Sequence, residues 1–270
     1  MNWTEPRVPS DALGNATGLL QPGDPAPLEL LRPRGASPWL FVVDHAGQAI
    51  PRALGDLGLP PGEIDRHIGW DIGIAGVARS LAGLLDAWTI LQPYSRLVID
   101  CNRPLESPTS IVEASDGTAV PANIGLDDVA RAARQRGIFQ PYHACIAQAL
   151  DQRAAEGRPT LLATLHSFTP AMAGFERPWH CGVLYHRHTA LPHALLEALR
   201  GEGDLVVGDN QPYAVTATSD YAVPVHGEAR GLAHVELEIR QDLIADDAGQ
   251  QMWAQRLARI LAGLAPRFTN

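Results

Sequence analysis

Short apolar runs alternate along the chain with segments in which apolar residues recur at helical spacing. The first clear run, residues 38–43 (PWLFVV), has no polar position, which is typical of a parallel strand buried on both faces. The spacing of apolar residues over 62–87 predicts a helix, because it places them on one helical face. Two further apolar runs, at 88–91 and 96–100, predict strands.

The second half of the chain continues this alternation. Helices are predicted at residues 126–136, 141–155, 191–200 and 249–264, and strands at 160–165, 182–186, 204–207 and 233–240. Strands and helices that alternate without internal repeats predict an α/β layered fold with a mostly parallel or mixed sheet.

Two segments lack this periodicity. Residues 1–36 are rich in Pro, Gly and polar residues and predict a lead-in with one short edge strand near 28–31, ahead of a single α/β domain over 37–270. Residues 104–124 are rich in Pro, Ser, Thr, Asp and Asn and predict a long loop. Because loops of this length inside a domain are usually functional or mobile, this segment is a candidate lid.

Charge and missing residue types exclude several kinds of chemistry. The chain has 21 basic and 30 acidic residues and a net charge of -9, so we expect no nucleic-acid partner, because phosphates repel an acidic surface. None of the basic residues is a lysine, which excludes a Schiff-base lysine, a pyridoxal phosphate anchor and a P-loop lysine. The GxSxG and GxGxxG motifs are absent as well. Ten histidines are the conspicuous remaining feature.

Segments that direct or anchor a protein are not found in the sequence. No apolar run reaches the roughly 18 residues needed to span a bilayer, and the start MNWTEPRVPSD has neither the basic nor the apolar part of a signal peptide. We therefore expect a cytoplasmic protein without a membrane partner. Cys101, Cys145 and Cys181 are too far apart for a cysteine-based zinc cluster and odd in number, so we expect buried thiols.

Polar side chains lie at or near the ends of four predicted strands. His45 follows the first strand, Asn102 and Arg103 follow the run at 96–100, His166 follows the strand at 160–165, and Glu238 lies near the end of the last strand. Because the carboxyl ends of neighbouring strands in an open α/β sheet face one crevice, we expect these groups to converge. Two imidazoles and one carboxylate are the ligand set of a hydrolytic zinc site, in which a second carboxylate acts as general base.

The third metal ligand has more than one candidate. Gln48 lies three residues after His45, where an HxxE motif would have a glutamate, but glutamine is a poor zinc ligand. His67 and Asp71 are four residues apart in the predicted helix and would share one helical face. Either could bind the metal, or His67 could orient Asp71 through a hydrogen bond.

Structural roles compete with these interpretations. A single histidine at a strand end is more often a hydrogen-bonded structural residue than a ligand, and Asp71 could be satisfied by a backbone donor. A surface cluster of polar residues accounts for His186, His188 and His193. Ion pairs with nearby acids could hold four arginines, namely Arg96 with Asp100, Arg103 with Glu106, Arg177 with Glu176 and Arg240 with Asp242.

Eight short strings add a resemblance that covers most of the chain. In order between about Trp39 and Trp253 they are DHAGQAIP, HIGWDIG, YSRLVIDCNRPL, QPYHACI, LHSFTP, RPWHCGVLY, GDNQPY and ELEIRQDL. Together they resemble the N-formylglutamate amidohydrolase family. The resemblance implies a three-layer α/β/α fold with a mixed, mostly parallel sheet, similar to zinc carboxypeptidases and the aspartoacylase group. It also implies hydrolysis of N-formyl-L-glutamate to formate and L-glutamate, the last step of one histidine degradation route.

The resemblance also implies roles for the residues of the candidate metal site. His45 in DHAG and His166 in LHSF look like ligands of one zinc ion, and Asp71 in WDIG looks like the carboxylate ligand between them. Glu238 falls where these metalloamidases keep the carboxylate that activates water. Asp44, where many members have Glu, would accept a hydrogen bond from an imidazole.

Substrate recognition follows from the same resemblance. Asn102 and Arg103 match a pair that related enzymes use for a substrate carboxylate, and a small anionic substrate fits an acidic protein only where arginines gather. The arginines within the strings are Arg96, Arg103, Arg177 and Arg240.

The strings also leave other functions open. GDNQPY has Gln211 where many members have Glu, so a different N-acyl amino acid or a cell-wall-type amide stays an alternative substrate. A non-catalytic protein that binds small anions is a second alternative. A hydrolase that uses Ser167 or Cys101 as nucleophile is a third, although no motif supports it.

Overall fold

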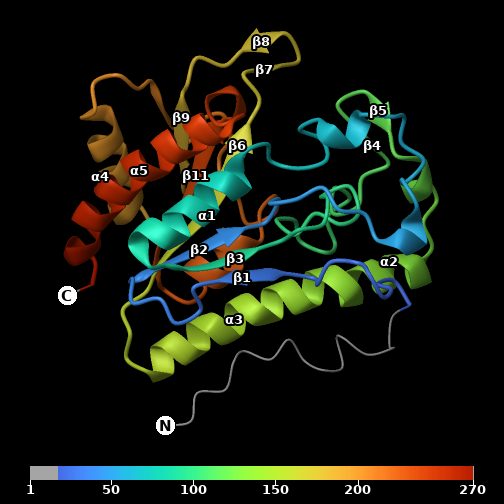
Figure 1. Cartoon of the computed structure of the whole chain (residues 1–270), viewed down its shortest axis with the longest axis horizontal. Coiled ribbons are helices and arrows are strands. Elements are labelled where there is room, and N and C mark those ends of the chain that lie inside the picture. The colour runs from blue at the N-terminus through green and yellow to red at the C-terminus, as the bar shows by residue number, and fades with distance from the viewer. Residues whose placement is uncertain (1–17, 270) are drawn as a thin grey trace.

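A seven-stranded sheet forms the centre of the computed structural model, which describes residues 18–269 (Figure 1). Its strands in chain order are β1 (Glu29–Leu31), β2 (Trp39–Val43), β3 (Trp88–Leu91), β6 (Leu161–Phe168), β9 (Cys181–Leu184), β10 (Val207–Asp209) and β11 (Ala233–Arg240). Their order in the sheet is β1-β3-β2-β6-β11-β9-β10. Strands β3, β2, β6 and β11 are parallel, whereas β1, β9 and β10 run in the opposite direction. The expected mixed, mostly parallel sheet is confirmed.

Helices cover both faces of this sheet. They are α1 (Ile74–Leu85), α2 (Asp128–Arg134), α3 (Gln140–Ala155), α4 (Ala190–Arg200) and α5 (Asp247–Leu264). Helices α1, α4 and α5 lie on one face, and α3, preceded by α2, lies on the other (Figure 1). Two small hairpins stand apart from the sheet, namely β4 (Ala114–Ser115) with β5 (Thr118–Ala119), and β7 (Ala171–Met172) with β8 (Phe175–Glu176). The arrangement is the three-layer α/β/α fold that the resemblance implies.

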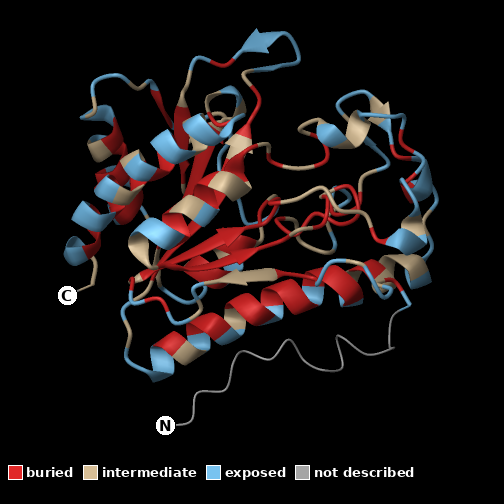
Figure 2. Ribbon diagram, viewed as in Figure 1, coloured by how far each residue is buried: buried red, intermediate tan, exposed pale blue. Residues whose placement is uncertain are grey.

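Strand β2 needs helices on both sides because all five of its residues are buried. Trp39, Phe41 and Val43 belong to the core cluster shared with α1, α4 and α5. Leu40 and Val42 belong to the cluster shared with α3. Successive side chains of a strand point to opposite faces, so an uninterrupted apolar run places both faces of β2 in the core. The burial of the central strands is visible in Figure 2.

Strands β6 and β11 carry their polar side chains on one face, except for Ser167 of β6. Their parallel register pairs His166 with Glu238 and Thr164 with Glu236, while Leu165 between them belongs to the opposite, apolar face. Paired residues of neighbouring strands point the same way. The sheet face that is apolar at β2 therefore becomes polar at β6 and β11.

The helix predicted over 62–87 is wrong in its first half. Helix α1 begins only at Ile74, and the preceding residues form a short 3-10 turn, Glu63–Asp65, followed by further turns. Gly73 has a φ of 81°, and a Cβ there would lie 2.0 Å from the backbone oxygen of Ile244. Apolar residues in the turns are spaced as in a helix, but the left-handed glycine separates the turns from α1.

The strand predicted at 96–100 is also wrong, because these residues form turns. Leu97, Val98 and Ile99 are nevertheless buried in the cluster shared with α3. The apolar run thus reflects burial and not an extended backbone. Asn102 and Arg103 therefore follow a buried turn and not a strand end.

The other predicted elements are present, the strands at 88–91 and 233–240 with the expected ends and the rest with shifted ends. The largest shift is β10, which begins at Val207 where the expected strand ended. The edge strand of the lead-in is confirmed as β1, whereas residues 1–17 of that lead-in lie outside the described residues. Cys101, Cys145 and Cys181 are buried and free, as expected. Between residues 18 and 269, none of the helices is both long and apolar enough to cross a membrane.

The loop at 104–124 is anchored to the molecule by a buried side chain. It contains the β4–β5 hairpin and the 3-10 turn Pro121–Asn123. The Asn123 amide donates hydrogen bonds of 2.9 Å to the Leu97 carbonyl and 2.7 Å to the Val112 carbonyl. That this loop acts as a lid stays a prediction.

Candidate metal centre

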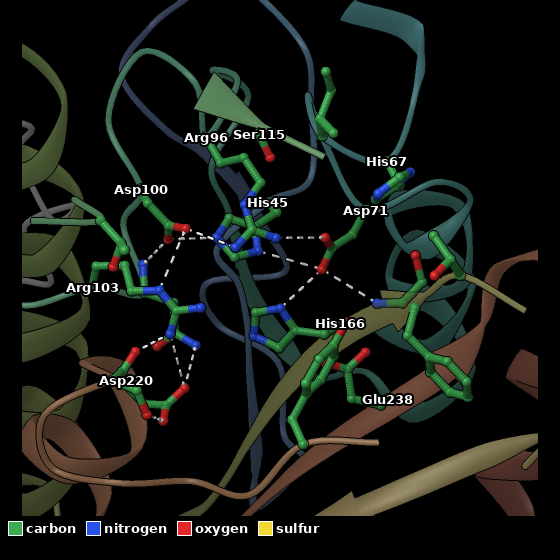
Figure 3. Close-up of a pocket in the computed structure, with 18 of the residues that line it drawn as sticks. His45, His67, Asp71, Arg96, Asp100, Arg103, Ser115, His166, Asp220 and Glu238 are labelled. Carbon is green, nitrogen blue, oxygen red and sulfur yellow. Dashed lines mark hydrogen bonds and ion pairs between the residues drawn. The ribbon is translucent and has the colours of Figure 1, made fainter. Parts of the chain in front are cut away.

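Three buried side chains from distant parts of the chain meet at the carboxyl ends of the central strands (Figure 3). His45 follows β2, His166 lies in β6, and Asp71 lies in the turn before α1. Their candidate ligand atoms all lie within 4.8 Å of one another. Asp71 Oδ2 is 2.9 Å from His166 Nδ1 and 3.4 Å from His45 Nδ1. The convergence expected from the strand ends is present for both histidines.

The turn that carries Asp71 is tied to both strand ends. The backbone N–H of Asp71 donates to the carbonyl of His45 at 3.0 Å, and the N–H of Ser167 donates to Asp71 Oδ2 at 3.3 Å. His67 has a different neighbour, since its Nε2 lies 3.5 Å from Asp116 Oδ2. The prediction that His67 and Asp71 share one helical face is therefore wrong, because no helix spans them. Of the two candidates, Asp71 is the one grouped with both histidines.

The second nitrogen of each imidazole faces a buried carboxylate. His45 Nε2 lies 2.7 Å from Asp100 Oδ1, and His166 Nε2 lies 3.4 Å from Asp44 Oδ2. A carboxylate that accepts a hydrogen bond from one ring N–H leaves the other ring nitrogen free to bind a metal. Asp44 lies beside an imidazole without the expected hydrogen bond, and Asp100, expected only as a partner of Arg96, lies beside the other.

A divalent cation such as Zn²⁺ fits this donor set. Two imidazole nitrogens and one carboxylate oxygen are the usual protein ligands of a catalytic zinc ion. Both carboxylate oxygens of Asp44 and Oε2 of Glu238 are buried without a hydrogen-bond donor. Buried anionic oxygens without donors are costly unless positive charge lies nearby. The two histidines and Asp71 are therefore suited to hold a divalent ion.

For Asp71 and Asp100, the nearby imidazoles and Arg96 together outweigh the effect of burial on the pKa. Burial by itself would raise the pKa of Asp71, but the charge of His45 and the hydrogen bond to His166 hold this pKa far below its ordinary value. Burial also opposes ionisation of Asp100, yet Arg96 and His45 lower its pKa well below the usual range. Both carboxylates are therefore ionised in the folded protein.

Two glutamates of β11 have the opposite electrostatics. Burial, together with the negative charges of Asp71 and Glu236, raises the pKa of Glu238 well above its ordinary value. Burial likewise raises the pKa of Glu236 to about 7, with a further contribution from Asp220. Glu236 was not predicted, although the alternation E-L-E in β11 places it on the same face as Glu238.

These side chains open onto one cavity of about 470 Å³. His45, Asp71, His166 and Glu238 contribute to its wall, and Figure 3 shows them turned toward one another. Apolar side chains of Val112, Phe168, Met172 and Tyr213 also line it. A cavity of this size is typical of a site for a small organic ligand.

Comparisons with known proteins agree with this geometry. A family described as N-formylglutamate amidohydrolase matches residues 37–245. The chain belongs to the N-formylglutamate amidohydrolase family. A family match over this length makes the chain an amidohydrolase, that is, a hydrolase of amide bonds.

Two solved structures among those similar to this chain match most of its length. A gene product of Agrobacterium tumefaciens has a TM-score of 0.88 at 32% identity, over 91% of this chain and 97% of that chain. An N-formylglutamate amidohydrolase from Ralstonia eutropha JMP134 has a TM-score of 0.72 at 18% identity, over 90% of this chain and 98% of that chain. No match is found among curated proteins.

In this member of the N-formylglutamate amidohydrolase family, two of the expected arginines line the cavity. Arg96 Nη2 lies 2.7 Å from Asp100 Oδ2, and its Nη1 lies 3.5 Å from Asp71 Oδ1. Arg103 Nη1 lies 3.5 Å from Asp220 Oδ1, and its Nε lies 3.9 Å from Asp100 Oδ2. The alternative ion pair of Arg96 with Asp100 is confirmed, whereas Arg103 pairs with Asp220 in place of the expected Glu106.

The other two arginines are absent from the cavity wall. Arg240 pairs with Asp242, with 2.8 Å between Nε and Oδ1, because the chain turns immediately after β11. The cavity wall therefore does not support a contact of Arg240 with substrate, which stays a prediction. Arg177 is 7% exposed; it stacks 4.9 Å from the ring centroid of Tyr213 and donates to Thr169 Oγ1 at 3.1 Å. Arg177 thus lies behind the wall, and its direct contact with substrate is not supported.

Asn102 lines the cavity, but its amide groups already have partners. Its Oδ1 accepts hydrogen bonds of 3.1 Å from the backbone N–H groups of Tyr221 and Ala222, and its Nδ2 donates to Asp220 Oδ1 at 3.4 Å. Asn102 therefore positions the segment that carries Asp220. Sequence reasoning did not single out Asp220, because it lies 118 residues from Asn102.

Proposed function

We propose that this chain is a metal-dependent amidohydrolase that cleaves the amide bond of a small anionic N-acyl amino acid. N-formyl-L-glutamate, which gives the family its name, is the reference substrate. One observation carries the proposal, namely the buried group of His45, Asp71 and His166 at a cavity that also contains Glu238. Zinc is the metal that this donor set favours.

The residues of the site divide the reaction between them. His45, Asp71 and His166 hold a divalent ion, which when bound polarises the amide carbonyl and makes water more acidic. Glu238 accepts the proton of the attacking water as the water oxygen bonds to the acyl carbon. Glu238 then passes this proton to the amide nitrogen as the C–N bond breaks. The products are the carboxylic acid of the acyl group and the free amino acid.

The raised pKa of Glu238 suits this role. Burial and the charges of Asp71 and Glu236 raise the pKa of Glu238, so it can hold a proton between its two transfers, and the positive charge of a bound divalent ion would lower this pKa so that the carboxylate can accept the proton first. Arg96, which lies between Asp71 and Asp100, can stabilise negative charge that develops on the carbonyl oxygen. Arg103 also lies on the cavity wall, where it pairs with Asp220.

The first experiment measures metal content and formate release together. We expect the purified protein to contain about one zinc ion per chain and to release formate from N-formyl-L-glutamate or a related N-formyl amino acid. His166→Ala should lose both the metal and the activity while keeping the fold, because it removes a ligand. His193→Ala is the matched control, since His193 is exposed and outside the cavity. Full activity in His166→Ala would contradict the proposal.

A further inference from the structure

We propose that Asp220 restricts this amidohydrolase to N-acyl amino acids with an uncharged side chain, because the Asp220 carboxylate already neutralises Arg103. The inference rests on the proposed amidohydrolase activity and concerns which substrate that activity prefers. N-acyl derivatives of glutamine, methionine or leucine belong to the preferred class. N-acyl derivatives of glutamate and aspartate, which carry a second carboxylate, do not.

Asp220 is held firmly on the cavity wall. It is 8% exposed, and its Oδ2 accepts hydrogen bonds from the Thr216 N–H at 2.9 Å and from Ser219 Oγ at 2.6 Å. Its Oδ1 faces Arg103 Nη1 at 3.5 Å and Asn102 Nδ2 at 3.4 Å. The pair of residues that would receive a substrate carboxylate therefore already holds a carboxylate of the chain itself.

The remaining charges of the wall do not replace the cation that Asp220 neutralises. Arg96, the other guanidinium on the wall, contacts Asp71 and Asp100. The wall thus carries two arginines and three aspartates even before its glutamates are counted. A divalent ion bound by the histidines would leave these arginines and aspartates with a single net positive charge, enough for one substrate carboxylate. A second carboxylate would be left without a matching cation, which is costly where water is excluded.

Arg177 is a further cation near the site. It forms no ion pair with a carboxylate among residues 18–269. Its guanidinium contacts Tyr213 and Met172, which line the cavity, whereas Arg177 itself is not part of the wall. Its charge can favour the α-carboxylate that every N-acyl amino acid has. It offers no donor on the wall for a second carboxylate.

The apolar part of the wall fits an uncharged substrate side chain. Val112, Met172 and Tyr213 line the same cavity as Asp220. An apolar or amide side chain can pack against them without a counter-ion, whereas a carboxylate placed against them would form no ion pair with them. Both the charges and the apolar surface therefore favour a substrate with a single carboxylate.

A matched pair of substrates tests this inference. N-formyl-L-glutamine and N-formyl-L-glutamate have the same shape and differ in one charge. We expect kcat/KM to be at least tenfold higher for N-formyl-L-glutamine, and calorimetry on the Glu238→Gln variant to show correspondingly tighter binding. Equal values, or a preference for N-formyl-L-glutamate, would overturn the inference and leave the amidohydrolase proposal intact. No formate from any N-formyl amino acid would contradict the proposed activity itself.

The Asp220→Asn variant tests the residue responsible. Asparagine keeps the size of the side chain and removes the charge that neutralises Arg103. We expect the kcat/KM for N-formyl-L-glutamate, relative to N-formyl-L-glutamine, to rise about tenfold. Asp242→Asn is the control, because Asp242 pairs with Arg240 outside the cavity and should leave the ratio unchanged. An unchanged ratio in folded Asp220→Asn would refute the role of Asp220, and the substrate pair tests the preference even where this variant does not fold.

Discussion

Each imidazole of the candidate metal centre lies between two carboxylates. Asp71 lies on the inner side of both rings, while Asp100 lies beyond the His45 ring and Asp44 beyond the His166 ring. This pattern fixes the ring orientation and leaves one nitrogen of each histidine directed at the Asp71 carboxylate. At the scale of single residues, each carboxylate therefore faces a particular ring nitrogen: Asp71 faces the two Nδ1 atoms, Asp100 faces Nε2 of His45, and Asp44 faces Nε2 of His166.

Glu238 can be separated from metal binding by an isosteric substitution. The Glu238→Gln variant keeps the shape of the side chain but cannot accept a proton, so we expect zinc content to be unchanged. Its kcat should fall by roughly 100- to 10,000-fold, the usual contribution of a general base. Elemental analysis and steady-state kinetics measure the two effects. An unaffected kcat would assign the base to another group, with Glu236 as the neighbouring candidate.

Asp100 has a testable effect on metal affinity. Asp100→Asn removes the charge that faces His45 Nε2 at 2.7 Å. We expect zinc affinity to fall by about 10- to 100-fold, the typical effect of losing such a partner. Competition with a chromogenic chelator measures this change. Asp209→Asn is the control, because Asp209 is exposed. The zinc affinity of this variant should equal that of the unmodified protein.

At the scale of elements, the site depends on the register of the neighbouring strands β6 and β11 and on the turn before α1. The parallel register of β6 and β11 sets His166 beside Glu238, and a shift of either strand by one residue would reverse its faces. The turn before α1 brings Asp71 to the same place. Secondary structure therefore positions Glu238, the proposed base, relative to His166, and a turn supplies Asp71, the proposed carboxylate ligand.

Gly73 is the glycine on which that turn depends. Gly73 has a φ of 81°. In Gly73→Ala the new Cβ would lie 2.0 Å from the backbone oxygen of Ile244, so the backbone at one of these two residues must move. We expect the free energy of unfolding to fall by roughly 1–3 kcal/mol, and zinc binding to weaken as Asp71 shifts. Denaturant unfolding and zinc titration measure both. Gly83→Ala in α1, where a Cβ meets no atom within 4 Å, should not be destabilised.

At the scale of the whole molecule, the metal centre links segments that lie far apart in the chain. His45, Asp71 and His166 come from β2, the turn before α1, and β6, so an ion bound to all three connects two central strands and one connection of the sheet. The two core clusters on either side of the sheet hold these segments together without it.

Binding of zinc should therefore stabilise the folded chain as a whole. An ion that binds only the folded state raises stability by about 2.7 kcal/mol when its concentration is 100 times Kd. We expect a chelator to lower Tm by several degrees and added zinc to restore it, because about 1 kcal/mol shifts Tm by roughly 2–4 °C at this size. Calorimetric scans measure this. We expect the Tm of His166→Ala to be the same with and without zinc. The same result for the unmodified chain would show that it has no such site.

The sequence by itself determined the fold class, the family and the two histidines of the site. Uninterrupted apolar runs such as 38–43 occur where a strand is buried on both faces, and helical spacing marks the helices that cover them. The strings around His45 and His166 are local, so they could be read without a structure. The same holds for Glu238, which lies within one continuous strand.

Only the tertiary structure decided which charges meet. The apolar spacing of residues 62–73 and 96–100 indicates burial, and buried turns can have the same spacing as helices and strands. The sequence therefore predicted the wrong backbone conformation around Asp71. The contacts of Asp100 with His45 and of Asp220 with Arg103 join residues 55 or more positions apart. Such contacts depend on how the layers pack, and no local pattern encodes them.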